Sequence, residues 1–269
     1  EKKNFKFYKI DLNDFFSLSK KLKKYKFDIV FHFAAQAGVR YSNIFPKKYI
    51  NSNIHGFNNL YYSINNQYLK KFIYASSSSI YGDQLKFPLN EKLKAKPKNL
   101  YGNSKKLNEY MAEFFSMNSQ SKFIGLRFFT MYGEWGRPDM FMFKLFKSYF
   151  SKKTFYLNNF GNHNRDFTYI EDAVKILKKL ITKKIVKKHT VFNICSNKPI
   201  NIKDTIIFFK KRIGNLNVKL IEKHHLDVLN THGDNKKIKN FLKDLKFSNF
   251  NKKFVKTFNW YKKTKIYKF

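Results

Sequence analysis

The stretch Phe27–Ala35, FDIVFHFAA, is an almost unbroken apolar run with the length of a single strand. Strands of a parallel sheet that carries helices on both faces have this pattern, because neither side of the strand meets water. Similar runs follow at Phe72–Ser76 and Lys122–Phe128, and helical periodicity separates them after Pro46 and over Tyr101–Ser119. This order predicts an α/β fold built on a parallel, doubly wound sheet with right-handed crossovers.

Weaker patterns flank this core on both sides. A strand is expected at Phe5–Ile10 and a lysine-rich helix near Asp14–Tyr25. Beyond Gly133 the expected elements are shorter: helices near Met140–Phe150, Glu171–Ile181 and Lys203–Ile213, a strand at Thr190–Ile194, and two small amphipathic helices within Asn235–Phe269. We therefore expect a core sheet domain over residues 1–130 and a smaller region, residues 131–269, interleaved with it.

The composition is that of a globular protein, with 269 residues of which 43% are hydrophobic and 27% charged. The single cysteine, Cys195, excludes an internal disulfide and fits a reducing cytosol, so we expect a cytoplasmic protein. No apolar run reaches the roughly 18 residues of a membrane span. The seven histidines form no His-Glu-x-x-His motif and no cluster with cysteine. We expect no membrane partner and no metal.

The net charge of +37 raises the question of nucleic acid as a partner. The lysines are scattered along the whole chain among abundant Asn, Phe, Ile and Tyr, as in proteins from A/T-rich genomes. No zinc-finger, homeodomain or RNP-type pattern accompanies them. We interpret the charge as solvated helix faces and expect no nucleic-acid partner. The alternative, a basic nucleic-acid module, predicts duplex binding that weakens steeply with salt.

The pentapeptide Tyr101–Lys105, YGNSK, is the first candidate for catalysis. Residues four apart share one face of a helix, so the phenol and the ammonium can converge on one substrate. A nearby ammonium favours phenolate, and a phenol whose pKa is lowered in this way can act as a general base. By itself the motif is weak evidence, because the chain contains 17 tyrosines and many lysines.

A run of hydroxyls strengthens this interpretation. Tyr74–Gly82, YASSSSIYG, places four serines at the end of a predicted buried strand. Ligands bind at the carboxyl ends of parallel strands, where these hydroxyls can bind a sugar hydroxyl or carboxylate. The alternative is a serine-rich turn that satisfies its own hydrogen bonds.

Several segments together resemble a known family. Phe33–Ala35, the serine run, Tyr101–Lys105 and Leu126–Thr130 occur in the order found in extended short-chain dehydrogenase/reductases. Three longer strings resemble nucleotide-sugar epimerases that act on uronic acids: Ala34–Ser42 (AAQAGVRYS), Met131–Met140 (MYGEWGRPDM) and Gly161–Ile170 (GNHNRDFTYI). The chain is most similar to the NAD-dependent UDP-glucuronate 4-epimerases of the capsular-polysaccharide type.

The resemblance implies NAD as cofactor and a UDP-sugar as substrate. It implies that Tyr101 is the catalytic base, that Lys105 holds the nicotinamide ribose and lowers the tyrosine pKa, and that Ser77 bonds the reacting 4-hydroxyl. Further cofactor contacts are implied for Asp11 and Leu12 at the adenine, for Phe33, Ala34, Ala35 and Gln36 along the dinucleotide, and for Asn53 on the helix behind it. Substrate contacts are implied for Ser78 and Ser79 near the sugar carboxylate, Thr130 and Arg137 facing the uronate and its diphosphate, Arg165 at the diphosphate and Asp227 at the uridine ribose.

The implied reaction converts UDP-glucuronate to UDP-galacturonate by oxidation at C4, rotation of the keto sugar and re-reduction. Related dehydratases need a carboxylate pair just after the position of Ser77, and uronate decarboxylases carry a Glu there, whereas this chain has Ser78 and Ser79. Thr130 and Arg137 favour a charged uronate over a neutral hexose. Another UDP-sugar 4-epimerase or a uronate decarboxylase remains the alternative. The family also implies a homodimer formed by helices near Pro46–Asn66 and Tyr101–Ser119.

One family feature is missing from the sequence. The phosphate loop Gly-x-x-Gly-x-x-Gly of the Rossmann fold follows the first strand, but no two of the ten glycines here form Gly-x-Gly. That loop is expected to precede Phe5 and to supply backbone N–H groups to the pyrophosphate. We therefore expect a fragment that lacks about one βαβ unit of a Rossmann-like sheet, with an inactive binding remnant as a further alternative.

Overall fold

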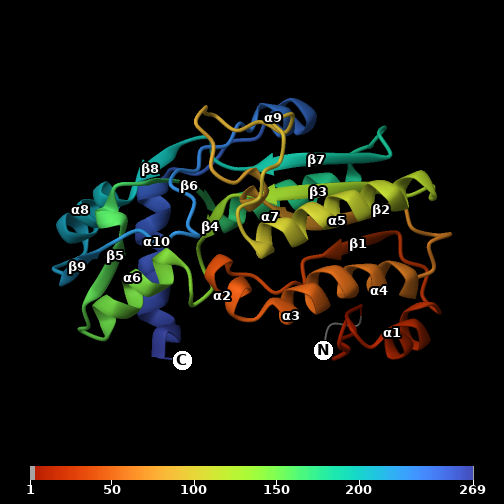
Figure 1. Ribbon diagram of the computed structural model, residues 1–269, viewed down its shortest axis with the longest axis horizontal. Coiled ribbons are helices and arrows are strands. Elements are labelled where there is room, and N and C mark those ends of the chain that lie inside the picture. Colours follow the sequence, from red (N-terminus) through yellow and green to blue (C-terminus); the bar gives the residue numbers. More distant parts are fainter. Residues whose placement is uncertain (1–3, 269) are drawn as a thin grey trace.

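The computed structural model of the protein describes residues 4–268. Its centre is a four-stranded, fully parallel sheet in the order β1-β2-β3-β7 (Figure 1). The strands are β1 (Ile29–His32), β2 (Lys71–Ser77), β3 (Lys122–Phe128) and β7 (His189–Ile194). Four predicted strand segments thus lie in one sheet, and the expected parallel α/β fold is confirmed.

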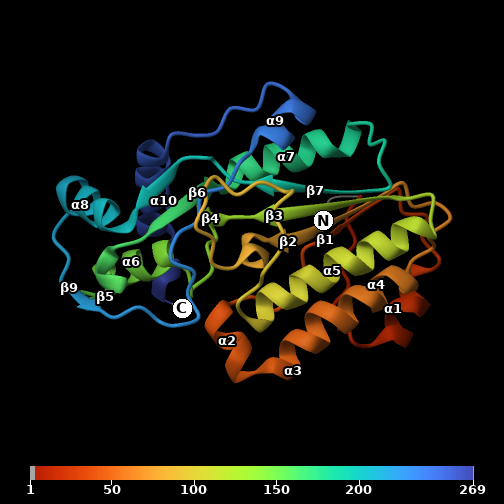
Figure 2. The ribbon, with the colours of Figure 1, turned by 45° about the horizontal axis from the view of Figure 1, so that its top comes forward.

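Helices cover both faces of this sheet, as a doubly wound fold requires (Figure 2). On one face, α4 (Gly56–Ser63) and α5 (Leu100–Met117) pack on the side chains of Phe72, Tyr74 and Phe123. On the other face, α7 (Ile170–Thr182) and α9 (Lys236–Leu242) pack on Ile73, Ile124 and Leu126. Successive residues of β2 and β3 therefore alternate between two separate cores, which explains why Phe72–Ala75 and Phe123–Leu126 carry no charged side chain.

A smaller region lies beyond the carboxyl ends of the strands (Figure 1). Its strands are β4 (Thr130–Tyr132), β6 (Asn164–Tyr169) and β8 (Pro199–Asn201) in one sheet, and β5 (Phe155–Asn158) and β9 (Val218–Ile221) in another. Its helices are α6 (Phe141–Phe150), α8 (Ile202–Arg212) and α10 (Phe250–Thr264). An aromatic core that includes Phe146, Phe209 and Phe254 holds these helices together.

The remaining helical segments are short. They are α1 (Phe15–Leu22), α2 (Val39–Ile44), α3 (Pro46–Tyr49), a π-helical segment (Ile50–His55) and 3-10 turns at Ser78–Tyr81, Asn159–Gly161 and Ile266–Lys268. The predicted helix after Pro46 is therefore one nearly continuous helix that changes its winding on the way to α4. Within residues 4–268 no helix combines the length and the apolar character needed to cross a bilayer.

Two predictions near the beginning of the chain are wrong. Residues 5–10 form no strand, and the side chains of Phe5 and Phe7 are 70% and 76% exposed. The first apolar run is not buried on both faces either, since Phe31 and Phe33 are 38% and 41% exposed. The physical reason is that, within the described residues, β1 is an edge strand that pairs with β2 alone.

Candidate active site

The three predicted catalytic residues meet at the carboxyl end of β2. Ser77 is the last residue of β2, and Tyr101 and Lys105 lie on the first turns of α5. The Lys105 ammonium donates to the carbonyl of Ala75 at 2.9 Å, and the Ser77 hydroxyl lies close enough to the Tyr101 phenol to lower its pKa. The tyrosine, the lysine and the serine thus lie within reach of one bound molecule.

Local sequence explains why α5 begins at this place. The Asn99 side chain accepts a hydrogen bond from the Gly102 N–H at 2.9 Å and so caps the helix. A Cβ at Gly102 would lie only 2.6 Å from the carbonyl oxygen of Ser79. Glycine therefore allows the first turn of α5 to touch the serine loop, which brings Tyr101 next to Ser77.

Burial changes the acidity of both α5 groups. Lys105 is 4% exposed, and burial lowers its pKa to about 8. Burial raises the pKa of Tyr101, while the hydrogen bond from Ser77 and the positive charge of Arg137 act in the opposite direction. The cation that favours the Tyr101 phenolate in this structure is thus Arg137, whereas the resemblance implied Lys105.

The loop that follows β1 is tied to α5 through Asn53. The Asn53 carboxamide accepts from the Gln36 N–H at 2.7 Å and donates to the Gln36 carbonyl at 3.0 Å. It also donates to the Ser104 hydroxyl at 2.9 Å. Phe33 packs edge-on against Phe128 at the end of β3. The predicted cofactor segment of Phe33, Ala34, Ala35 and Gln36 therefore lies beside the catalytic helix, where Asn53 was expected to support it.

Arg137 reaches the same place from the smaller region. Its guanidinium binds the Asp139 carboxylate, with 2.9 Å between Nε and Oδ1, and its charge acts on Tyr49 and Tyr101. Thr130 begins β4, directly after the turn at the end of β3. The pKa of the Asp139 carboxyl lies below its usual value because Arg137 outweighs the effect of burial.

The other predicted substrate residues divide into two groups. Ser78 and Ser79 form the turn after Ser77, and the Ser79 N–H donates to the Ser77 hydroxyl at 3.1 Å. Arg165 donates to the carbonyls of Val228 and Leu229 at 2.8 and 2.7 Å, which brings it next to the loop that carries Asp227. The Asp227 carboxylate pairs with Arg40 at 2.7 Å. Arg165 and Asp227 thus lie together, in the smaller region of the fold.

Asp11 and Leu12 lie apart from this group. The Asp11 carboxylate binds the backbone and side chain of its neighbour Asn13, both at 2.9 Å. Leu12 packs against the start of α4, since a Cβ on Gly56 would lie 3.0 Å from the Leu12 Cβ. Leu12 therefore lies beside α4, where the Asn59 side chain donates to its carbonyl at 2.9 Å, whereas the hydrogen bonds of Asp11 stay within its own turn.

The residues present fit the nicotinamide-ribose part of NAD. Lys105 is a nearly buried ammonium with three donors, and the hydrogen bond to Ala75 uses one of them. The remaining donors suit a pair of ribose hydroxyls, and Tyr101 lies on the same helical face. For the pyrophosphate, the sequence provides no Gly-x-Gly loop. The residues assigned to NAD are therefore those of the nicotinamide end and the Phe33–Gln36 loop.

Sequence reasoning missed four charged or polar residues that the structure brings to this region: Arg40, Tyr49, Glu109 and Asp139. Glu109 had a visible signal, because it follows Tyr101 and Lys105 at the same spacing of four. Arg40 and Asp139 stand inside the strings that carried the family resemblance. Tyr49 donates to the carbonyls of Ala37 and Gly38, and no signal in the sequence marked it.

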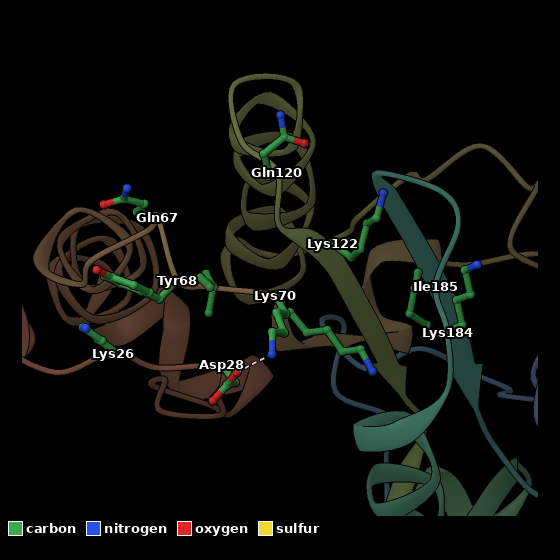
Figure 3. Close-up of a pocket in the computed structure, with 11 residues that line it drawn as sticks. Lys26, Asp28, Gln67, Tyr68, Lys70, Gln120, Lys122, Lys184 and Ile185 are labelled. Atoms are coloured by element: carbon green, nitrogen blue, oxygen red, sulfur yellow. Dashed lines mark ion pairs between the residues drawn. The ribbon is translucent and has the colours of Figure 1, made fainter.

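A hollow lined by several lysines lies at the end of the sheet opposite Ser77 (Figure 3). It has a volume of about 590 Å³ and surrounds the first residues of β2 and β3, Lys71 and Lys122. Lys70 pairs there with Asp28 at 2.7 Å, and Lys71 donates to the carbonyls that end α7. Because ligands of such sheets bind at the carboxyl ends of the strands, we assign the active site to the Ser77 end.

A doubly wound sheet with a Tyr-x-x-x-Lys pair at the carboxyl end of its strands defines the class of extended short-chain dehydrogenase/reductases. Within that class the chain belongs to the NAD dependent epimerase/dehydratase family, whose model matches residues 1–195.

Individual relatives agree with this assignment. The chain is 39% identical to an uncharacterized protein of Methanocaldococcus jannaschii, over 86% of this chain and 71% of the relative. It is 35% identical to protein CapI of Staphylococcus aureus, over 84% and 72% of the two chains. Among solved structures, UDP-glucuronic acid 4-epimerase of Bacillus cereus in complex with UDP-glucuronic acid and NAD has a TM-score of 0.89 and 28% identity, covering 97% of this chain and 82% of that one.

Proposed function

We propose that the protein is an NAD-dependent nucleotide-sugar 4-epimerase that interconverts UDP-glucuronate and UDP-galacturonate. The observation that carries the proposal is the convergence of Ser77, Tyr101 and Lys105, with the charge of Arg137 acting on Tyr101. The similarity to the Bacillus cereus epimerase over 97% of this chain supports the same activity.

Each residue of the triad has a task that follows from its position. Tyr101 takes the proton of the sugar 4-hydroxyl and later returns it, because its phenol is the titratable group on the substrate side of α5. Ser77 orients that hydroxyl, because its own hydroxyl lies beside the Tyr101 phenol and lowers the phenol pKa. Lys105 holds the ribose hydroxyls and stays fixed by the Ala75 carbonyl. When bound, NAD supplies the hydride acceptor and donor at C4.

The charges in the site favour a uronate and simple epimerisation. Arg137 presents a planar cation beside Tyr101; Asp139 binds its Nε and Nη2 groups, and the remaining donors are left for a carboxylate or phosphate of the substrate. After Ser77 the chain has only the hydroxyls of Ser78 and Ser79, which cannot do the acid–base work of a carboxyl group. Thr130, Arg165 and Asp227 complete the proposed substrate contacts, with Asp11 and Leu12 proposed at the adenine.

The outer face of α5 supports a homodimer. Leu107, Tyr110, Phe114 and Met117 are 44%, 55%, 59% and 71% exposed and follow one another three or four residues apart, so they form one apolar stripe. The neighbouring α4 adds Tyr62, which is 46% exposed. Two copies that pack these helices together bury the stripe. Phe114→Glu is expected to yield a monomer in light-scattering measurements, and an unchanged mass would contradict the dimer.

Three broader assignments belong to the same proposal. Residues 1–130 serve mainly the cofactor and residues 131–269 mainly the substrate, because Lys105 and Asn53 lie in the first part and Arg137, Arg165 and Asp227 in the second. The reduced, buried Cys195 fits a cytoplasmic location. The similarity to CapI supports a role in capsular polysaccharide synthesis.

The decisive assay is incubation of the chain with NAD and UDP-glucuronate, followed by chromatographic detection of UDP-galacturonate. UDP-glucose and UDP-N-acetylglucosamine serve as competing substrates in parallel reactions. Conversion of UDP-glucuronate with no loss of carbon supports the proposal. Release of CO₂ or conversion of the neutral sugars alone would instead identify a decarboxylase or a different 4-epimerase.

A further inference from the structure

A buried polar network lies directly behind the proposed catalytic residues. Three successive residues of β2 lie beside three residues of α5 that follow one another four apart. Ser77 lies beside Tyr101 and lowers its pKa, the Ala75 carbonyl accepts from Lys105 at 2.9 Å, and the Ser76 hydroxyl donates to Glu109 at 2.6 Å. The third of these contacts lies one helical turn further from the substrate than Lys105 and is not part of the proposed chemistry.

Glu109 is held by a buried ion pair with Arg127 of β3. The guanidinium binds both carboxylate oxygens, with Nε to Oε1 at 2.9 Å and Nη2 to Oε2 at 2.8 Å. The side chains of Arg127 and Glu109 are only 7% and 10% exposed. This two-pronged geometry fixes both the distance and the rotation of α5 relative to the sheet, because either movement breaks two hydrogen bonds at once.

The same arginine also holds the serine turn. Arg127 donates from Nη1 to the Tyr81 hydroxyl at 2.9 Å, and Tyr81 ends the 3-10 turn that begins at Ser78. The Tyr81 hydroxyl in turn donates to Asn193 of β7 at 2.7 Å. One guanidinium therefore connects the helix that carries Tyr101 to the turn that carries the proposed sugar-binding hydroxyls.

We infer that Glu109 and Arg127 are positioning residues, which set the register of α5 against β2 and so keep Tyr101 and Lys105 aligned with Ser77 and the serine turn. This inference rests on the proposed function. An apolar pair of similar volume is often as stable as a buried ion pair, so stability alone does not require these charges. What an apolar pair lacks is a directional contact that defines one register.

The test separates stability from alignment with three variants: Glu109→Leu, Arg127→Met and the double variant, which forms an apolar pair. Each single change leaves one buried charge without its partner and should lower the urea midpoint. The double variant removes both charges, so its urea midpoint should return most of the way to the wild-type value. Because a displacement of about 1 Å can reduce a rate about 100-fold, kcat should fall about 100-fold in all three variants. The KM for UDP-glucuronate should change less than about threefold, since Arg137 and Arg165 are untouched. A stable double variant with wild-type kcat would refute the inference.

Asp172→Asn is the matched control. Asp172 is a buried carboxylate on α7, on the other face of the sheet, and accepts from the Ser248 N–H and hydroxyl at 2.7 and 2.8 Å. Its replacement should lower the urea midpoint and leave kcat unchanged. An equal loss of kcat in this variant would show that any buried polar deletion disturbs the site, which would also overturn the inference.

A spectroscopic measurement tests alignment without turnover. In isotope-labelled protein without substrate, the Lys105 signal, assigned by its loss in Lys105→Met, should titrate near pH 8. In the double variant, which has the same net charge as the wild type, we expect this titration to move upward by at least about one pH unit as the ammonium regains water. An unchanged titration would contradict the inference. Failure of the wild-type chain to convert any UDP-sugar would instead refute the proposed function and leave this measurement to decide on alignment.

Discussion

Both ends of the central sheet carry lysines, but Lys105 at the carboxyl end is buried and Lys70 at the amino end is exposed. At the carboxyl end, Lys105 is 4% exposed, donates to one carbonyl and has a pKa of about 8. At the amino end, lysines surround a hollow of about 590 Å³, and Lys70 and its partner Asp28 are 75% and 66% exposed (Figure 3). The comparison teaches that a hollow and a high charge do not identify a site. A site is better identified by a buried ionisable group whose pKa is shifted and which lies beside other reactive groups.

Removal of the Tyr101 hydroxyl should have the largest effect of any single change at either end. Tyr101→Phe deletes the proposed base and should reduce kcat for UDP-glucuronate by about 1,000-fold or more, which corresponds to about 4 kcal/mol. Tyr68→Phe at the amino-end hollow is the control and should retain wild-type kcat. Turnover of the Tyr101→Phe variant at the wild-type rate would contradict the mechanism.

Lys105 should make the stability of the protein depend on pH, because burial lowers its pKa. Because burial disfavours its charged form, the folded state binds fewer protons than the unfolded state between about pH 8 and the ordinary lysine pKa of 10.5. The unfolding free energy of the wild type, relative to Lys105→Met, should therefore be lowest below pH 8 and rise by about 3 kcal/mol towards pH 10.5.

Urea titrations at several pH values measure this difference. Lys122→Met is the control for the size of the substitution, because the Lys122 ammonium donates to the Val186 carbonyl at an exposed position of the amino end. Parallel curves for Lys105→Met and the wild type would show that burial does not disfavour the charged form of Lys105.

Arg137 should affect binding of a charged sugar more than binding of a neutral one. Arg137→Gln removes the guanidinium next to Tyr101 and should raise KM for UDP-glucuronate about 10-fold to 100-fold, the range for a lost hydrogen bond to a charged group. Binding of UDP-glucose, measured by calorimetry, should weaken much less. Equal weakening for both ligands would assign Arg137 to the diphosphate rather than the carboxylate.

Changes at the amino end should affect stability only, and by the smallest amounts. Lys71 donates to the carbonyls of Leu180 and Lys183, both at 2.9 Å, and so caps the end of α7. Lys71→Met should lower the unfolding free energy by about 1–2 kcal/mol and leave kcat unchanged. Lys70→Met breaks only an exposed pair and should leave the urea midpoint where it is. A loss of activity in either variant would mean that the amino end takes part in function.

Much of the fold followed from local pattern. The predicted strand at Lys122–Phe128 has the observed bounds, and the helices expected near Pro46 and Tyr101 are present, because apolar periodicity is a local property. The predicted strand at Phe5–Ile10 failed for a non-local reason, since a strand exists only where a neighbour offers hydrogen bonds. Glu109 could be found from the sequence, because it follows Lys105 by four residues, as Lys105 follows Tyr101. Its partner Arg127 could not, because it lies on another element 18 residues away.

The sequence by itself determined the alternation of strands and helices, the family, and the candidate residues Ser77, Tyr101 and Lys105, because each depends on neighbours along the chain. Only the tertiary structure decided how those residues are charged and held. Burial of Lys105, the action of Arg137 on Tyr101 and the pairing of Glu109 with Arg127 depend on groups that folding alone brings together. Desolvation and Coulomb energies vary with distance and depth in space, and neither can be read from positions along the chain.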